Sequence, residues 1–124
     1  MTYISHAETR RTETPNAVMT TLASPTQGGA GQAVWRVDMR AGAAGPPHAF
    51  DTEQVWTVLE GGATIELGGE PVALAPGDTV VLPAGVPRRV FADAGKGFTA
   101  IVAAPAGGCA STPDGTRVVP AWIA

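Results

Sequence analysis

The stretch that decides the fold is GPPHAFDTEQVWTVLEGG, residues Gly45–Gly62. It begins with a glycine and a proline pair and ends with a glycine pair, and between them Gln54, Trp56 and Val58 recur at every second position. Glycine and proline end regular elements, and an alternation with a period of two is typical of a β-strand. The sequence therefore predicts a strand here, with a single histidine, His48, at its head.

The rest of the chain repeats this pattern of short segments between glycines and prolines. Of its 124 residues 16 are Gly and 11 are Pro, so that helices do not fit in the gaps. The segments themselves are rich in Val, Thr, Trp and Ile. The sequence therefore predicts an all-β protein of antiparallel strands, closed as a barrel or sandwich, with strands at 17–22, 33–39, 54–60, 63–67, 71–75, 78–83, 88–92, 98–104 and 116–123.

Length and charge limit the classes of function. A chain of 124 residues fits one domain, and a net charge of -3 with 15% charged residues leaves no basic stripe for nucleic acid. No apolar run is long enough to cross a bilayer, and the polar N-terminus lacks the apolar core of a signal peptide. We expect a cytoplasmic protein without nucleic-acid or membrane partners. Residues 1–15 are expected to form an arm, as an edge strand or a strand swapped onto a partner subunit, and residues 16–124 one barrel domain.

Two motifs carry a family resemblance. The positions of G-x5-H-x-H-x3-E-x6-G are held by Gly42, His48, Phe50, Gln54 and Gly61, and those of G-x5-P-x-G-x2-H-x3-N by Gly77, Pro83, Gly85, Arg88 and Ala92. These are the two motifs of the cupin superfamily, and the chain resembles a small cupin over residues 42–92. All five glycine and proline positions match, and these residues suit turns with positive or fixed φ. The resemblance implies a cupin-type jelly-roll β-barrel of two antiparallel sheets.

The ligand positions of the motifs depart from the family. A cupin typically holds a divalent metal with three histidines and one carboxylate, and only His48 matches. Phe50 has no lone pair, Arg88 is a permanent cation, and Gln54 offers an amide in place of the carboxylate. We therefore expect neither a metal nor another cofactor.

What remains at these positions is a predicted pocket. By strand parity, the catalytic residues His48, Gln54 and Arg88 are expected to converge among the substrate-binding side chains Phe50, Trp56, Val58 and Val90. A cation from Arg88 would suit an anionic ligand such as a carboxylate, phenolate or enolate. The same cation disfavours imidazolium, so that His48 would stay neutral and able to accept a proton.

Structural roles are an alternative for the same residues. His48 could be a relic of a metal site that hydrogen-bonds a neighbouring strand, and Arg88 could pair with Asp51 or Glu53 or turn its head out of the barrel mouth. Asp51 or Glu53 could also be recruited to a metal, although Glu53 has the strand parity opposite to that of Gln54.

Three functions are consistent with these residues. The first is a metal-independent isomerase, cyclase, lyase or dehydratase acting on a small, partly apolar anion, with His48 as acid or base, Arg88 as charge stabiliser and Gln54 orienting. The second is a non-catalytic small-molecule-binding cupin. The third is a metal-dependent oxygenase or lyase with unusual ligands. The Ala- and Gly-rich composition is typical of high-GC genomes, where small cupins accompany natural-product pathways. Trp35, Trp122 and the arm give the chain apolar surface to cover, which predicts a homodimer.

Overall fold

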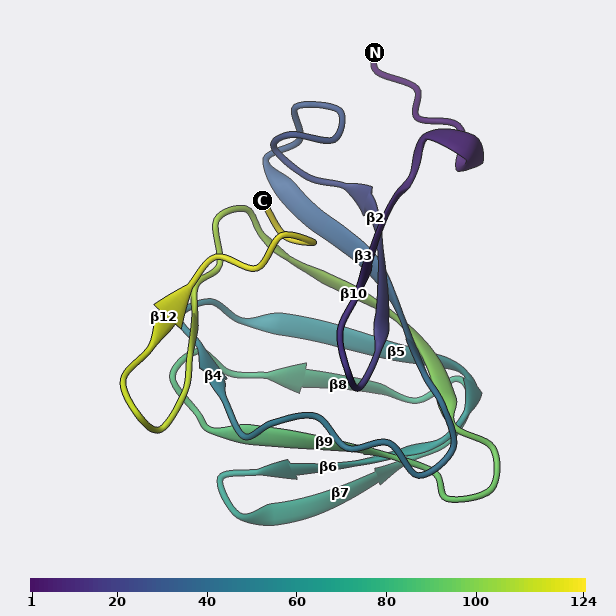
Figure 1. Cartoon of the computed structure of the whole chain (residues 1–124), viewed down its shortest axis with the longest axis vertical. Coiled ribbons are helices and arrows are strands. Elements are labelled where there is room, and N and C mark those ends of the chain that lie inside the picture. Colours follow the sequence, from purple (N-terminus) through teal and green to yellow (C-terminus); the bar gives the residue numbers. More distant parts are fainter.

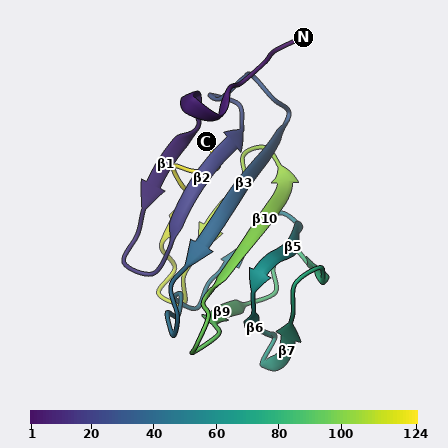
Figure 2. The ribbon, with the colours of Figure 1, turned by 90° about the vertical axis from the view of Figure 1, so that its right-hand side faces the viewer.

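The computed structural model describes residues 1–124 and consists almost entirely of strands (Figure 1). The larger layer is a six-stranded antiparallel sheet in the order β1-β2-β3-β10-β5-β8. Its strands are β1 (Arg10–Glu13), β2 (Val18–Ala23), β3 (Gln32–Met39), β10 (Phe98–Pro105), β5 (Gln54–Gly61) and β8 (Thr79–Leu82). Figure 2 shows β1, β2, β3, β10 and β5 side by side in this sheet.

Two three-stranded sheets complete the barrel. One has the order β7-β6-β9 and the other the order β12-β11-β4. They contain β7 (Glu70–Leu74), β6 (Ala63–Leu67), β9 (Arg88–Ala92), β12 (Arg117–Val118), β11 (Ala110–Ser111) and β4 (Ala49–Phe50). Bridges from His48 to Arg88 and from Ala44 to Phe91 join the chain before β4 to β9. The predicted jelly-roll β-barrel is confirmed, with its smaller layer divided into two sheets.

The predicted strands agree with the observed ones except near the ends of the chain. Residues 10–13 form β1, which pairs with β2 of the same chain as an edge strand, after a short 3-10 turn, η1 (His6–Glu8). The strand predicted at 116–123 is wrong beyond Val118, because only Arg117–Val118 pair, with the two-residue β11. Pro120, which follows, has no N–H to continue a ladder.

The interior of the barrel follows the alternation of the sequence. Trp35, Val37 and Met39 on β3 point inward and are 2%, 0% and 7% exposed. The neighbouring strand β10 continues this inner face, with its Val102 opposite Trp35 in register. None of the chain's helices has the length and apolarity that a membrane span requires.

The motif glycines hold the turns between strands. Gly61 has a φ of 72° and lies so close to the carbonyl of Gly97 that a Cβ would collide with it. The other motif glycines also have positive φ, as predicted: 74° at Gly42, 89° at Gly77 and 77° at Gly85.

Candidate functional site

A cavity of about 440 Å³ opens at one end of the barrel. Its inner wall comes from the strands and its outer walls from the β1–β2 turn and from the C-terminal segment, the yellow part of the chain at the left of Figure 1. All three tryptophans of the chain, Trp35, Trp56 and Trp122, line it. His48 is the one lining residue with a titratable side chain. The cavity is thus largely apolar, with few polar groups to orient a ligand.

His48 lines this cavity, and one of its ring nitrogens can accept a proton. Its Nδ1 lies 2.8 Å from the carbonyl oxygen of Pro46. A carbonyl only accepts hydrogen bonds, so Nδ1 carries the proton in the neutral ring and Nε2 keeps its lone pair. Burial lowers the pKa of His48 below its ordinary value, and the nearby charge of Arg88 lowers it further, while the bond to Pro46 opposes both. His48 is therefore neutral at neutral pH.

Gln54 lines the cavity and has one side-chain donor without a partner. Its Oε1 accepts from Trp56 Nε1 at 3.1 Å and from Arg88 Nη1 at 3.0 Å. Because both partners only donate, the orientation of the amide is fixed. The other amide atom, Nε2, is buried without a partner, and the residue is 1% exposed. An unpaired buried donor on a residue that lines a cavity is a candidate contact for a ligand oxygen.

Arg88 lies behind this amide as a buried cation. It is 2% exposed, donates through Nη2 to the Pro83 carbonyl at 3.3 Å, and its Cζ lies 5.3 Å from the centre of the Phe50 ring. Burial lowers its pKa to about 10, so that it is still charged at neutral pH. It has no carboxylate partner, and its Nε has no hydrogen-bond partner. The barrel interior therefore contains an unbalanced positive charge.

The alternative ion pairs for Arg88 are wrong. Asp51 lies 3.6 Å from Arg117 instead, on the surface. Glu53 takes part in no ion pair. The alternative that Arg88 turns its head out of the barrel mouth is wrong as well, because the side chain is buried.

The structure brings most of the predicted site residues to one cavity, though not all. The backbones of His48 and Arg88 pair directly, at 3.0 and 2.8 Å, and His48, Phe50, Gln54, Trp56 and Val90 all line the cavity. Arg88 and Val58 are buried and do not line it. Sequence reasoning missed the outer walls, Thr14–Ala17 and the residues from Ala110 to Trp122, because neither has a strand alternation that shows which side chains point inward.

The side chains at the motif positions do not fit a divalent metal. No three His, Cys, Asp or Glu side chains lie together. Phe50 cannot ligate, and the oxygen of Gln54 already accepts two hydrogen bonds, one of them from the cation Arg88. His48 is left as a single imidazole.

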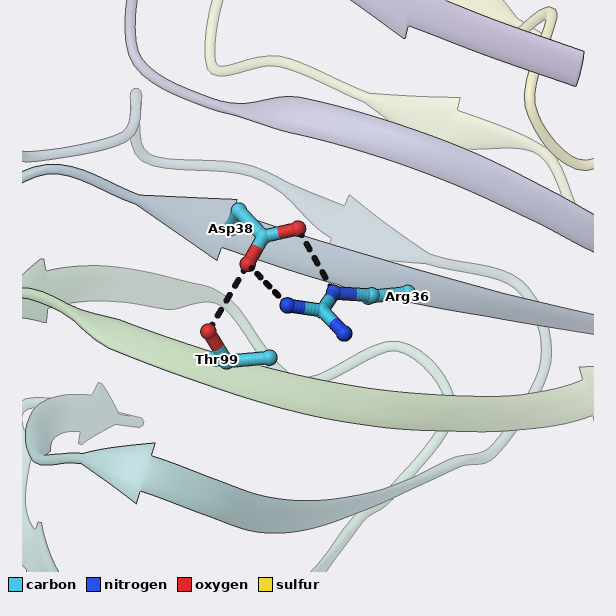
Figure 3. Close-up of polar contacts among 3 residues, drawn as sticks. All are labelled: Arg36, Asp38 and Thr99. Atoms are coloured by element: carbon cyan, nitrogen blue, oxygen red, sulfur yellow. Dashed lines mark hydrogen bonds and ion pairs between the residues drawn. The ribbon is translucent and has the colours of Figure 1, made fainter.

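A second, more open cleft of about 330 Å³ lies where β3 ends and β10 begins, and one of its charged groups, the carboxylate of Asp38, is already paired. Asp38 accepts from Arg36 at 2.8 and 3.0 Å and from Thr99 at 2.7 Å (Figure 3). The hydrogen bond from Arg36 lowers the pKa of Asp38. With its carboxylate satisfied by its own neighbours, Asp38 stabilises the sheet surface.

Comparisons with known proteins agree with this barrel. The family model for the cupin domain matches residues 35–103. The polyketide cyclase RemF from Streptomyces resistomycificus has a TM-score of 0.71 at 21% identity, over 85% of this chain and 79% of that one. KdgF from Halomonas sp. has a TM-score of 0.69 at 22% identity, over 85% and 94%. Oxalate decarboxylase from Bacillus subtilis has a TM-score of 0.72 at 15% identity, and this chain spans only 28% of it. Among curated proteins, none matches the sequence.

Proposed function

We propose that the cavity of this chain, which belongs to the cupin family, binds a small, partly apolar anion and moves a proton on it without a metal ion. Isomerisation, cyclisation, and lyase or dehydratase reactions are of this kind. The observation that carries the proposal is the amide of Gln54, a residue that lines the cavity: its Nε2 is a buried donor without a partner, while its oxygen is bonded to Arg88.

Gln54 and Arg88 would act together on a substrate oxygen. The Nε2 group donates to a carbonyl, phenolate or carboxylate oxygen in the cavity. Arg88 polarises the amide by donating to its other end, which strengthens the Nε2 donor. A preorganised donor supported by a buried positive charge stabilises an oxyanion as it forms. Arg88 is thus a positioning residue that acts through Gln54, since its own side chain does not line the cavity.

His48 would move the proton. Its Nε2 takes a proton from a carbon next to the substrate carbonyl, and the electron pair of that C–H bond becomes an enolate held by Gln54. In a β,γ-unsaturated ketone the electron pair of this enolate extends to the γ-carbon, and the imidazolium returns the proton there, which shifts the double bond. In a cyclisation the enolate carbon attacks a second carbonyl of the same molecule, and the proton goes to the new alkoxide. The lowered pKa of His48 suits a base that starts neutral.

Cyclisation in natural-product metabolism has one further support. RemF, whose barrel resembles this one, is described as a polyketide cyclase. The three cavity-lining tryptophans suit a flat, unsaturated substrate of that general kind.

Proton exchange on a simple ketone tests the chemistry. With β-tetralone in heavy water, wild-type protein is expected to accelerate exchange of the α-hydrogens, measured by NMR. The His48→Gln variant should lose about 10²- to 10⁴-fold of that acceleration while still binding the ketone. If β-tetralone binds and its exchange is no faster than in buffer, His48 is not a working base.

Non-catalytic binding is the second candidate function. It is favoured by the presence of one titratable group on the cavity wall, with no second acid or base beside it. In that case His48→Gln changes ligand affinity only, and the wild type leaves the exchange rate of β-tetralone unchanged.

We also expect a homodimer. Leu59 and Val81, on the outer face of β5 and the edge strand β8, are 46% and 52% exposed. Exposed apolar side chains beside an unpaired sheet edge favour association with a second copy. Sedimentation velocity checks this expectation, and a monomer at high protein concentration would contradict it.

A further inference from the structure

The C-terminal wall of the cavity is held by two buried side chains, one in β2 and one directly after it. Thr21 donates through Oγ1 to the main-chain carbonyl of Trp122 at 2.8 Å, and Ser24 donates through Oγ to that of Ala124 at 2.7 Å. Both donors are 0% exposed. Each would be left buried and unpaired if residues 122–124 moved away, which costs about 1–3 kcal/mol per group.

Further contacts fix the same segment. Thr26 Oγ1 donates to the Ala124 carbonyl at 2.6 Å, and the guanidinium of Arg10 donates to the carbonyls of Ala121 and Ala124, each at 2.9 Å. Ile123 is 0% exposed and belongs to the core. The backbone on both sides of Trp122 is therefore immobilised by hydrogen bonds and by a buried apolar side chain.

None of these hydrogen bonds involves the side chain of Trp122. Every hydrogen bond to the segment ends on a main-chain carbonyl. The indole of Trp122 packs against the core from a partly buried position and lines the cavity. A different side chain at this position would change the cavity and leave the anchoring bonds intact.

The facing wall is also fixed. Thr14 and Ala17 at the β1–β2 turn line the cavity. Thr14 Oγ1 accepts from the backbone N–H groups of Asn16 and Ala17 at 3.2 and 3.0 Å, and its own N–H donates to the Ala17 carbonyl at 2.9 Å. With both walls held, the cavity cannot widen easily for a large ligand.

We propose that Trp122 is a specificity-determining residue, which sets the upper size limit for flat aromatic ligands in the cavity. This inference rests on the proposed function, because it concerns the same cavity and ligand. It adds that the size limit is set by one side chain on a fixed backbone. A substitution of that side chain can therefore change the limit while His48 and Gln54, which act on the ligand, stay the same.

A series of aromatic carboxylates of increasing size tests the proposal. Benzoate, naphthoate, anthracenecarboxylate and pyrenecarboxylate are titrated against wild type, Trp122→Phe and Trp122→Ala, with binding followed by calorimetry. Pyrenecarboxylate should bind about tenfold or more tightly to Trp122→Ala than to wild type, with Trp122→Phe in between, whereas benzoate should bind equally or more weakly. The matched control is Val119→Ala, since Val119 is 43% exposed and does not line the cavity. It should bind all four probes as wild type does.

The outcomes separate this inference from the proposed function. Equal changes in affinity for all ring sizes in Trp122→Ala would overturn the size limit. The neutral carboxamides of the same rings are run in parallel. If they bind as well as the carboxylates while the size limit follows Trp122, the anion claim fails and this inference stands. If wild type binds none of the probes, both are overturned. Should Trp122→Ala fail to fold, the Trp122→Phe variant decides: it should bind pyrenecarboxylate more tightly than wild type does, and benzoate equally or more weakly.

Discussion

The side-chain oxygen of Gln54 lies 3.0 Å from Nη1 of Arg88, and both residues are almost fully buried. In the cupin motifs these two positions belong to a carboxylate and a histidine that face a metal. Here they bond to each other, and the pair has a net charge of +1 where a carboxylate partner would have cancelled it. The fold retains this charge in its interior, and a bound anion would balance it.

Arg88→Met tests whether the buried charge serves the ligand or the fold. Methionine fills similar space without a charge, and replacing a buried ionic group by an apolar one of similar volume is often neutral or stabilising. We expect an unfolding free energy equal to or above that of wild type in urea denaturation. Binding of naphthoate should weaken about tenfold, because the anion loses the buried positive charge behind Gln54 and the polarisation of the Nε2 donor. A loss of stability with unchanged naphthoate affinity would make Arg88 purely structural.

Gln54→Glu changes the other member of the Gln54–Arg88 pair. The new carboxylate can still accept from Arg88 and Trp56, but it removes the Nε2 donor and cancels the buried charge. Naphthoate binding should fall by more than about tenfold, and naphthamide binding much less, because only the anion is repelled. Calorimetric titration of the two probes measures the difference, and equal losses for both would show that charge plays no part.

His48 predicts a pH dependence of stability. Its folded pKa lies below the ordinary value of about 6.5, chiefly because of burial and then because of Arg88. The unfolded chain therefore takes up a proton first, and the unfolding free energy should fall as pH is lowered from about 7 through the ordinary pKa. Melting temperatures between pH 5 and 8 check this. His48→Gln should flatten that part of the profile, and an unchanged slope would contradict the lowered pKa.

Metal content separates the proposed chemistry from that of a metal-dependent cupin. Protein purified without added metal is expected to contain well under one equivalent of Fe, Mn, Ni, Cu or Zn, and a chelator should leave its melting temperature unchanged. Elemental analysis decides the point. One equivalent that is lost in His48→Gln would place a metal on the histidine and reject the metal-free proposal.

The anchoring of the C-terminal wall predicts a difference between two threonines of β2. Thr21→Val removes a buried donor to the Trp122 carbonyl and leaves that carbonyl unpaired, so that the unfolding free energy should drop by about 1–3 kcal/mol. The matched control is Thr20→Val, since Thr20 is partly exposed and alternates to the outer face. Urea denaturation of both variants measures the difference in unfolding free energy. Equal losses in the two variants would show that the hydrogen bond from Thr21 does not anchor the wall.

The sequence predicts the barrel well because its turns and its alternation are local. Gly61 has the positive φ expected of a tight turn, and the inward side of β5 follows from strand parity at Gln54 and Trp56. Parity also places Arg88 inside correctly. Strand parity does not say whether an inward side chain reaches the cavity or lies behind another side chain. Arg88 lies behind Gln54. That outcome depends on the hydrogen bond to Gln54, which is 34 residues away in the chain.

The C-terminal wall of the cavity could not be predicted from the sequence, for a different reason. Trp122 lies in an irregular segment with no period, and its position is set by carbonyl contacts with Thr21, 101 residues earlier, and with Arg10 at Ala121, 111 residues away. Only the folded backbone brings these groups together.

This arrangement has a consequence for the order in which the molecule assembles. Every strand of the six-stranded sheet lies before residue 106, whereas the C-terminal wall of the cavity is supplied from Ala110 onward. The sheet can therefore form while the later segment is still unattached, and contacts across about 100 residues of chain are slow to close. We expect a transient species with a formed sheet and solvent-exposed Trp35 and Trp56, which binds hydrophobic dyes during refolding. The capacity to hold a ligand would then be acquired in a later kinetic phase than the strands themselves.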